Sequence, residues 1–405
     1  MVKIHYAWFI MMACCAIQTS AGIIGTASSN LYPDISAELN IGIGTLTIYI
    51  TIMSLTMAGL FPIAGKFLGR ALKPALLIGG IVPYVALGCM SFFSNVYEFY
   101  VAGLFLGMGM SITIYMAVPI LINMWFHKKA GIAMGIAMAC NGCAAAIFSQ
   151  VAGFALPIIG WRATFLLLAV CGLVIYVPMI ALFVKTPEQK GVRPYGFEET
   201  RSIQKNIGKE EGLSFKEALE KPQFYCMLIL CICLCAIQAE TPHVSTASLV
   251  QFDVSVQTAA SLLSIFSMGL VIGNISFGAI DDRLGHLLAF SLGMVLLISA
   301  HLLLIIGKIS LVFVFSGTFL AGFSVATFTI IPPLMTNSIF GAKDYNRIWA
   351  YFMSAASISG AIAPPLYGFI FDLSGSYTLM YILIIVMALV SLLCSIIAVR
   401  VSKVY

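Results

Sequence analysis

The chain has 405 residues, of which 61% are hydrophobic and 9% charged, with a formal net charge of +5. Soluble domains are typically about 25% charged, so this composition excludes a soluble enzyme and a disordered chain. The charges are too scattered for a nucleic-acid-binding surface. A membrane-spanning helix needs roughly 20 apolar residues, and the chain holds enough of them for about twelve spans.

Apolar stretches of spanning length fall into two sets of six along the chain. The first set covers 6–30, 45–65, 75–94, 98–122, 130–156 and 162–184, and the second covers 223–249, 258–280, 287–307, 311–337, 348–371 and 378–399. The first stretch has no convincing cleavage site and is interpreted as an uncleaved span. The sequence therefore predicts an all-α membrane protein with six-helix bundles at 1–184 and 222–405, joined by a polar cytoplasmic linker at 185–221.

The distribution of basic residues predicts the orientation in the membrane. Of the 21 Lys and Arg residues, all but Arg162 and Lys308 lie on the same side of the predicted spans as Lys3. Short cytoplasmic loops are enriched in Lys and Arg. We therefore expect a multi-pass protein of the cytoplasmic (inner) membrane with both termini in the cytoplasm.

The eleven cysteines do not indicate a metal or redox site. Cys140 and Cys143 have CxxC spacing, but no second cysteine pair or histidine lies nearby, and the setting is apolar. We interpret these thiols as small hydrophobic side chains. The chain also has no G-x-x-x-x-G-K-[ST] sequence, so ATP hydrolysis is not expected. No cofactor is predicted.

The two halves of the sequence share an internal repeat. Residues 15–18 (Cys-Ala-Ile-Gln) recur at 235–238, and residues 65–70 resemble 278–283, in what is predicted to be the loop after the second span of each half. Each half has an even number of spans, so the repeat is parallel. Two such halves related by a pseudo-two-fold axis along the membrane normal are a transporter architecture.

The layout and a Gly-x-x-x-Asp-Arg-x-Gly stretch resemble the major facilitator superfamily across essentially the whole chain. The stretch is complete in the second half, whereas the first half has Gly69 and Leu72 where the motif has Asp and Gly. The resemblance implies an inter-helix gating role for Gly65, Arg70, Gly278, Asp282, Arg283 and Gly285. Residues 5–8, 123–135 and 160–162 resemble the monocarboxylate and oxalate–formate branch of this superfamily.

Glu240 is the one acidic residue inside a predicted span. A carboxylate near the middle of the bilayer costs a few kcal/mol and usually marks an ion or substrate path. His243 follows three residues later, and Pro242 interrupts the helix between them. The hypothesis is that Gln238, Glu240 and His243 line the solute cavity, with Glu240 carrying a proton or pairing with a cationic solute. The alternative is a hydrated Glu240 near the outer interface, hydrogen-bonded to His243.

Other polar residues in the spans give weaker signals. Membrane amides often bond between helices instead of facing a pathway. His301 has no partner in the sequence pattern and is predicted to be structural. Repeated glycines are predicted to allow close helix packing. The remaining substrate-pathway candidates are Gln18, Asn30, Tyr115, Asn141 and Asn274.

The family's usual charged groups are missing. Monocarboxylate transporters typically have an Asp and an Arg in the eighth span, where this chain has Leu270 and Asn274. The eleventh-span lysine of oxalate–formate exchangers falls near Ser354, and the fourth-span arginine of drug–proton antiporters corresponds to Gly103. The resemblance therefore leaves the solute open.

The sequence predicts a monomeric secondary transporter, not an enzyme, that moves a small organic solute by alternating access with proton coupling. The solute is monocarboxylate-like by resemblance. Alternatives are an exchanger or uptake carrier for a cationic, zwitterionic or neutral solute, then a drug efflux antiporter, then an intramembrane enzyme or sensor. The expected partners are the solute, protons and the lipid bilayer, with no nucleic acid.

Overall fold

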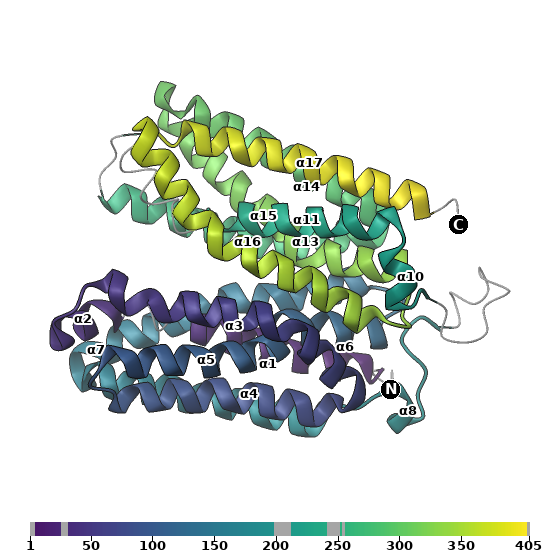
Figure 1. Ribbon diagram of the computed structural model, residues 1–405, viewed down its shortest axis with the longest axis horizontal. Coiled ribbons are helices and arrows are strands. Elements are labelled where there is room, and N and C mark those ends of the chain that lie inside the picture. The colour runs from purple at the N-terminus through teal and green to yellow at the C-terminus, as the bar shows by residue number, and fades with distance from the viewer. Residues whose placement is uncertain (1–4, 26–30, 198–211, 241–251, 253–255, 403–405) are drawn as a thin grey trace. The chain divides into compact units, whose positions relative to one another are not determined.

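The computed structural model describes residues 5–25, 31–197, 212–240, 252 and 256–402, and nearly all of them are helical (Figure 1). They form two compact units, the first within residues 1–207 and 349–354 and the second within residues 208–348 and 355–405. Within each unit the long helices run alongside one another. Each unit is described by itself below.

The first unit contains the spans of the first half of the sequence. Its long helices are α1 (Ala7–Gly25), α3 (Ile43–Arg70), α4 (Leu72–Cys89), α5 (Val96–Ile112) and α7 (Ala130–Phe183), joined by the short helices α2 (Tyr32–Leu39), η2 (Met90–Phe92), η3 (Thr113–Ala117), α6 (Val118–Trp125) and α8 (Pro187–Lys190). The element η3 is a π-helical turn that joins α5 to α6 within the fourth span. Asn95 and Glu98 form a capping box at the start of α5.

The second unit contains the spans of the second half. Its elements are α10 (Phe215–Leu219), α11 (Pro222–Gln238), α13 (Val256–Leu284), α14 (His286–Ile305), η4 (Gly307–Ile309), α15 (Leu311–Phe340), α16 (Tyr345–Ser374) and α17 (Thr378–Ser402). Proline at the first helical position of α11 suits a helix start, because that N–H has no partner inside the helix.

The helices account for all twelve predicted spans. Ten helices in the described residues are long and apolar enough to cross a membrane, with α7 counted once. Helix α7 has 54 residues and contains two predicted spans, separated at Gly160, whose φ of 73° and ψ of 168° are not helical. Helix α11, apolar but only 17 residues long, supplies the seventh span. The predicted continuation of that span, 241–249, lies outside the described residues.

The prediction that residues 65–70 and 278–283 form loops was wrong. Both stretches are the last turns of helices, α3 and α13. Both stretches stay helical although they are more polar than the spans, because they contain no proline and a helix tolerates their glycines. Helix α13 ends one residue before Gly285, whose φ of 81° favours glycine. Buried Asp281 then accepts a hydrogen bond of 2.8 Å from Nδ1 of His286, the first residue of α14.

Glycines bring helices into close contact in both units, as predicted. A Cβ atom added to Gly79 on α4 would meet Ile112 and Thr113 in the fourth span, and one added to Gly293 on α14 would meet Thr327 in the tenth span. These are matching span pairs in the two halves of the repeat. Small residues at such crossings permit the dispersion contacts that hold membrane helices together.

Both ends of the predicted linker are hydrogen-bonded to the units. In the first unit, Tyr195 N donates to Trp125 O at 2.8 Å, and His127 N donates to Tyr195 O at 2.9 Å. In the second unit, Leu213 N donates to Phe340 O at 2.8 Å, and Phe215 N donates to Asp344 Oδ2 at 2.7 Å. Residues 198–211, between these two attachments, lie outside the described part of the chain.

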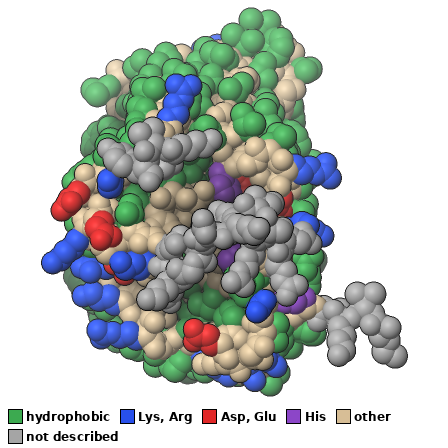
Figure 2. All heavy atoms as spheres, turned by 90° about the vertical axis from the view of Figure 1, so that its right-hand side faces the viewer, with side chains coloured by type: hydrophobic (Ala, Val, Ile, Leu, Met, Phe, Trp, Pro, Cys, Tyr) green, Lys and Arg blue, Asp and Glu red, His purple; other side chains and the backbone are tan. Residues whose placement is uncertain are grey.

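Basic side chains lie in the last turns of helices in each unit. Arg70, Arg283 and Arg400 occupy the last turns of α3, α13 and α17. Figure 2 shows Lys and Arg side chains on the face that it draws, next to apolar surface.

Candidate functional site

Glu240 lies just beyond the end of α11 and is buried, with 3% of its surface exposed. Its Oε2 atom is 2.8 Å from Nε2 of His301, which is fully buried on α14. His301 is one turn from the end of α14, at the opposite end from His286. The pair therefore sits inside the second unit, toward the end of the helices opposite Arg283.

The hydrogen bonds of His301 fix how many protons this pair holds. Nδ1 lies 2.8 Å from the carbonyl oxygen of Leu297, which can only accept, so Nδ1 carries a hydrogen. The bond between Nε2 and Oε2 then contains one further proton, either on Glu240 or on the imidazole. Removing that proton leaves a carboxylate facing an imidazole lone pair. The two side chains therefore share one proton between Oε2 and Nε2.

Aromatic residues of two more helices complete the surroundings of the pair. The ring of Tyr381 on α17 packs against His301 with centroids 5.8 Å apart, and Tyr367 Oη on α16 donates to the carbonyl of Ala236 at 2.6 Å. Among the described residues, Glu240 Oε1 has no hydrogen-bond partner although it is buried. A buried acceptor without a partner is uncommon in native proteins and can take a water or a solute donor.

The sequence singled out Glu240 but gave no sign of its contact with His301. His301 was predicted to be structural and to have no partner. The second part was wrong, because His301 is hydrogen-bonded to Glu240, and the structural role stays a prediction. The two residues are 61 positions apart, so no local spacing reveals the contact. His243, the partner expected from the sequence, lies outside the described residues, as does Pro242. Gln238 is the half-buried last residue of α11.

A second polar cluster lies in the first unit and joins three spans. Gln18 on α1 is 2% exposed, and its Nε2 donates to the carbonyl of Ile114 in η3 at 3.2 Å. Asn141 on α7 is half-buried, and its Nδ2 donates to Gln18 Oε1 at 3.2 Å. The structure thus brings together two of the candidates predicted from the sequence.

The carbonyl of Ile114 is available because of the local backbone. In a π-helical turn a carbonyl accepts from the N–H five residues later. For Ile114 that residue is Pro119, which has no N–H. The Gln18 amide supplies the missing donor. The carbonyl of the irregular turn and the buried glutamine amide thus satisfy each other's hydrogen-bonding groups.

The other candidates differ in their surroundings. Tyr115 is 41% exposed on η3. Asn274 is 4% exposed, and its Oδ1 accepts a hydrogen bond of 3.2 Å from Thr329. It therefore links α13 to α15, which is the bonding between helices given above as the alternative to facing a pathway. Asn30 lies outside the described residues.

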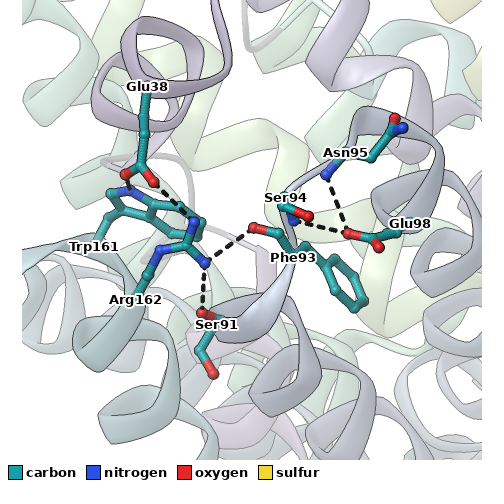
Figure 3. A network of polar contacts seen from close by, with 8 residues as sticks. All are labelled: Glu38, Ser91, Phe93, Ser94, Asn95, Glu98, Trp161 and Arg162. Carbon is teal, nitrogen blue, oxygen red and sulfur yellow. Dashed lines mark hydrogen bonds and ion pairs between the residues drawn. The ribbon is translucent and has the colours of Figure 1, made fainter.

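A charged network ties α2 to α7 in the first unit (Figure 3). Arg162 Nη1 donates to the carbonyls of Ser91 and Phe93 at 3.0 Å, and Nη2 lies 2.8 Å from Glu38 Oε1. Trp161 Nε1 donates to Glu38 Oε2 at 2.5 Å. The hydrogen bonds from Arg162 and then Trp161 lower the pKa of Glu38 below its ordinary value of 4.5.

This network predicts a pH-dependent contribution to stability. Because the pKa of Glu38 is lower in the folded protein, its contribution is complete above pH 4.5 and is lost as the pH falls through the lowered value. The thermal midpoint of wild type should therefore exceed that of Glu38→Gln at neutral pH, and the difference should shrink under acid conditions. The effect is expected to be small because the Glu38 side chain is 48% exposed.

Glu220→Gln is the matched control, since this exposed carboxylate has no ion pair in the described residues. Its midpoint should follow that of wild type at every pH. A Glu38→Gln midpoint that tracked wild type across the whole range would contradict the assigned role of the network.

Two sets of apolar helices of spanning length, with buried polar groups inside them, define a multi-pass membrane protein. The sequence profile described as Major Facilitator Superfamily matches residues 10–249 and 241–404. The chain belongs to this superfamily, which confirms the resemblance and the membrane fold predicted from the sequence.

Curated relatives are monocarboxylate transporters. Monocarboxylate transporter 12 of Homo sapiens is 22% identical over 76% of this chain, which covers 64% of that protein's length. Monocarboxylate transporter 12-B of Danio rerio is 25% identical over 79% of this chain, and the match covers 72% of that protein's length. The chain thus spans somewhat less than two thirds of the human relative.

Solved structures show the same fold. A variant of the E. coli fucose:proton symporter FucP superposes with a TM-score of 0.67 at 16% identity, covering 98% of this chain and 99% of that one. FucP in the outward conformation gives a TM-score of 0.65 at 13% identity, covering 97% and 99%. At this identity the likeness concerns the fold.

Proposed function

We propose that the protein is a secondary active transporter that moves a small organic solute across the cytoplasmic membrane by alternating access, with proton movement coupled through Glu240. The observation that carries the coupling is the buried hydrogen bond between Glu240 and His301. A buried pair that holds one proton can load it when water reaches the site and release it when the site opens to the other side. The end of the helices rich in Lys and Arg is proposed to be cytoplasmic.

The solute is proposed to be monocarboxylate-like. Support comes from the curated relatives, whose names describe monocarboxylate transport. In the described part of the chain, Lys and Arg lie at the ends of the spans or between them, and Arg162 follows the break that separates the two spans of α7. A monocarboxylate would therefore meet no lysine or arginine in the middle of a described span, and moving it together with a proton makes the transported pair electrically neutral.

A carrier for a cationic, zwitterionic or neutral solute is the second candidate. The same arrangement of charges favours it, because the buried acid Glu240 attracts a cation and the amides of the first unit suit a neutral solute. Drug efflux, intramembrane catalysis and sensing have no specific support among the described contacts. We further propose that the protein is a monomer and not an enzyme.

The test is solute uptake by wild-type protein in proteoliposomes, with and without an inward proton gradient. Monocarboxylates, amino acids and organic cations are compared in the same preparation. Accumulation of a monocarboxylate above its external concentration only under the gradient is the expected result. Accumulation of an organic cation alone would favour the second candidate, and conversion of a solute without flux would contradict transport.

A further inference from the structure

The two amides of the first unit have a defined orientation. Because the carbonyl of Ile114 can only accept, the group of Gln18 that faces it must be Nε2. The oxygen of Gln18 therefore points to Asn141, and the group of Asn141 that meets it must be its NH₂. The backbone of η3 thus fixes the direction of both side chains.

This arrangement leaves Asn141 with unused hydrogen-bonding capacity. Its NH₂ group has two hydrogens and gives one to Gln18, so one N–H donor remains, together with the Oδ1 acceptor. Oδ1 has no hydrogen bond within the described residues. Gln18 is buried, whereas Asn141 is half-buried, so Asn141 is the more exposed member of the pair.

The position of Asn141 suits a solute site. Asn141 lies on α7 between its start at Ala130 and the break at Gly160, and Gln18 is well inside α1. Solute sites of repeat-built transporters lie near the middle of the membrane. The charged residues of the described helices of the first unit lie near helix ends or, as Arg162 does, beside the break in α7, so no formal charge accompanies the amides.

The remaining donor and acceptor select a chemical group. A hydroxyl both donates and accepts, so it can pair with Oδ1 and with the remaining N–H. A carboxylate only accepts and an ammonium only donates, so each leaves half of the amide without a partner. An unpaired polar group in such a site is costly, which is how a hydrogen-bonding pocket discriminates between solutes.

We propose that Asn141, oriented by Gln18, binds a hydroxyl group of the transported solute. The proposal deepens the proposed function, on which it rests, and narrows the solute class to hydroxylated small organic molecules, such as a 2-hydroxy acid in preference to its deoxy analogue. Gln18 is a positioning residue in this arrangement.

The experiment compares matched pairs of solutes in one proteoliposome preparation: lactate against propionate, and glycolate against acetate. The ratio of hydroxylated to deoxy flux is independent of how much protein is folded, because both fluxes come from the same vesicles. Wild type is expected to prefer the hydroxylated solute about tenfold, the value of one net hydrogen bond. Asn141→Leu should bring the ratio to about one by lowering the hydroxylated flux. Gln18→Leu should give an intermediate ratio, since Asn141 remains but is no longer oriented.

Asn123→Leu is the matched control, an amide in α6 of the same unit that is not part of the pair, and it should retain the wild-type ratio. A wild-type ratio near one, or an unchanged ratio in Asn141→Leu, would overturn this proposal while flux continued and the proposed function stood. Hydroxyl preference without a response to the proton gradient would contradict only the proposed coupling. Absence of flux for every solute would contradict the proposed function, and this inference with it.

Discussion

Glu240→Gln is expected to abolish proton-driven accumulation while counterflow exchange of the same solute continues. Glutamine has the shape of glutamic acid, and its NH₂ group can donate to Nε2 of His301, so the buried hydrogen bond is preserved. The variant cannot bind or release a proton at this position. A gradient of one pH unit is worth about 1.4 kcal/mol and supports about tenfold accumulation in one-to-one coupling. The measured accumulation ratio should therefore fall from about ten to about one.

Two further variants separate coupling from folding. Glu220→Gln removes an exposed carboxylate outside the spans and should accumulate solute as wild type does. His301→Gln leaves the buried Glu240 without the imidazole that shares its proton, so accumulation should also be lost. If Glu240→Gln accumulates solute like wild type, Glu240 is structural and the proposed coupling is wrong, although the fold and the family remain.

The sequence was sufficient for the number of spans because each span is defined by composition alone. Twenty or so apolar residues in succession have few ways to satisfy their backbone other than as a membrane helix. The break inside α7 was also predicted correctly, since Gly160 separates two apolar stretches. Helix ends were less predictable. The last turns of α3 and α13 are polar enough to resemble loops, yet they contain no proline and their glycines do not end the helix.

The candidate site was predictable only in part, and for a physical reason. Glu240 is conspicuous because an acid in an apolar stretch is costly, and its rarity is visible without any structure. Its partner is determined by which faces of α11 and α14 pack together, and this depends on long-range contacts. Acidic and histidine residues are rare inside the predicted spans. A prediction that pairs these rare residues with one another, and not with their neighbours in the sequence, would have pointed to His301.

The amide pair illustrates the same limit. Gln18 and Asn141 were candidates on polarity alone, with no reason to place them together. Their contact depends on close packing of α1 and α7, where a Cβ added to Gly22 would lie 2.5 Å from the Asn141 carbonyl. The π-helical turn that orients them was not predicted, although Pro119 inside the fourth span was a signal of a carbonyl without a donor.

Gly322→Ala is expected to lower the stability of the protein sharply. Gly322 on α15 faces α13, and a Cβ added there would lie 2.0 Å from the carbonyl oxygen of Phe266. Gly269 and Gly273 of α13 face α15 equally closely, at 2.4 and 2.3 Å from the Phe319 and Phe323 carbonyls. Neither helix can yield, because the opposing atoms are backbone. Overpacking of this kind costs about 3 kcal/mol. At roughly 2–4 °C per kcal/mol, the thermal midpoint in detergent should fall by about 6–12 °C.

Gly368→Ala separates this clash from the general effect of replacing a helical glycine. Gly368 lies within α16 and has no atom within 4 Å of an added Cβ. Alanine favours the helix over glycine by about 0.8–1 kcal/mol at both positions, so Gly368→Ala should match or exceed the wild-type midpoint. The difference between the thermal midpoints of the two variants then measures the cost of the steric clash between α13 and α15 alone. Equal midpoints would mean that these helices do not meet at Gly322, and the close packing that holds Asn274 against Thr329 would have to be revised with it.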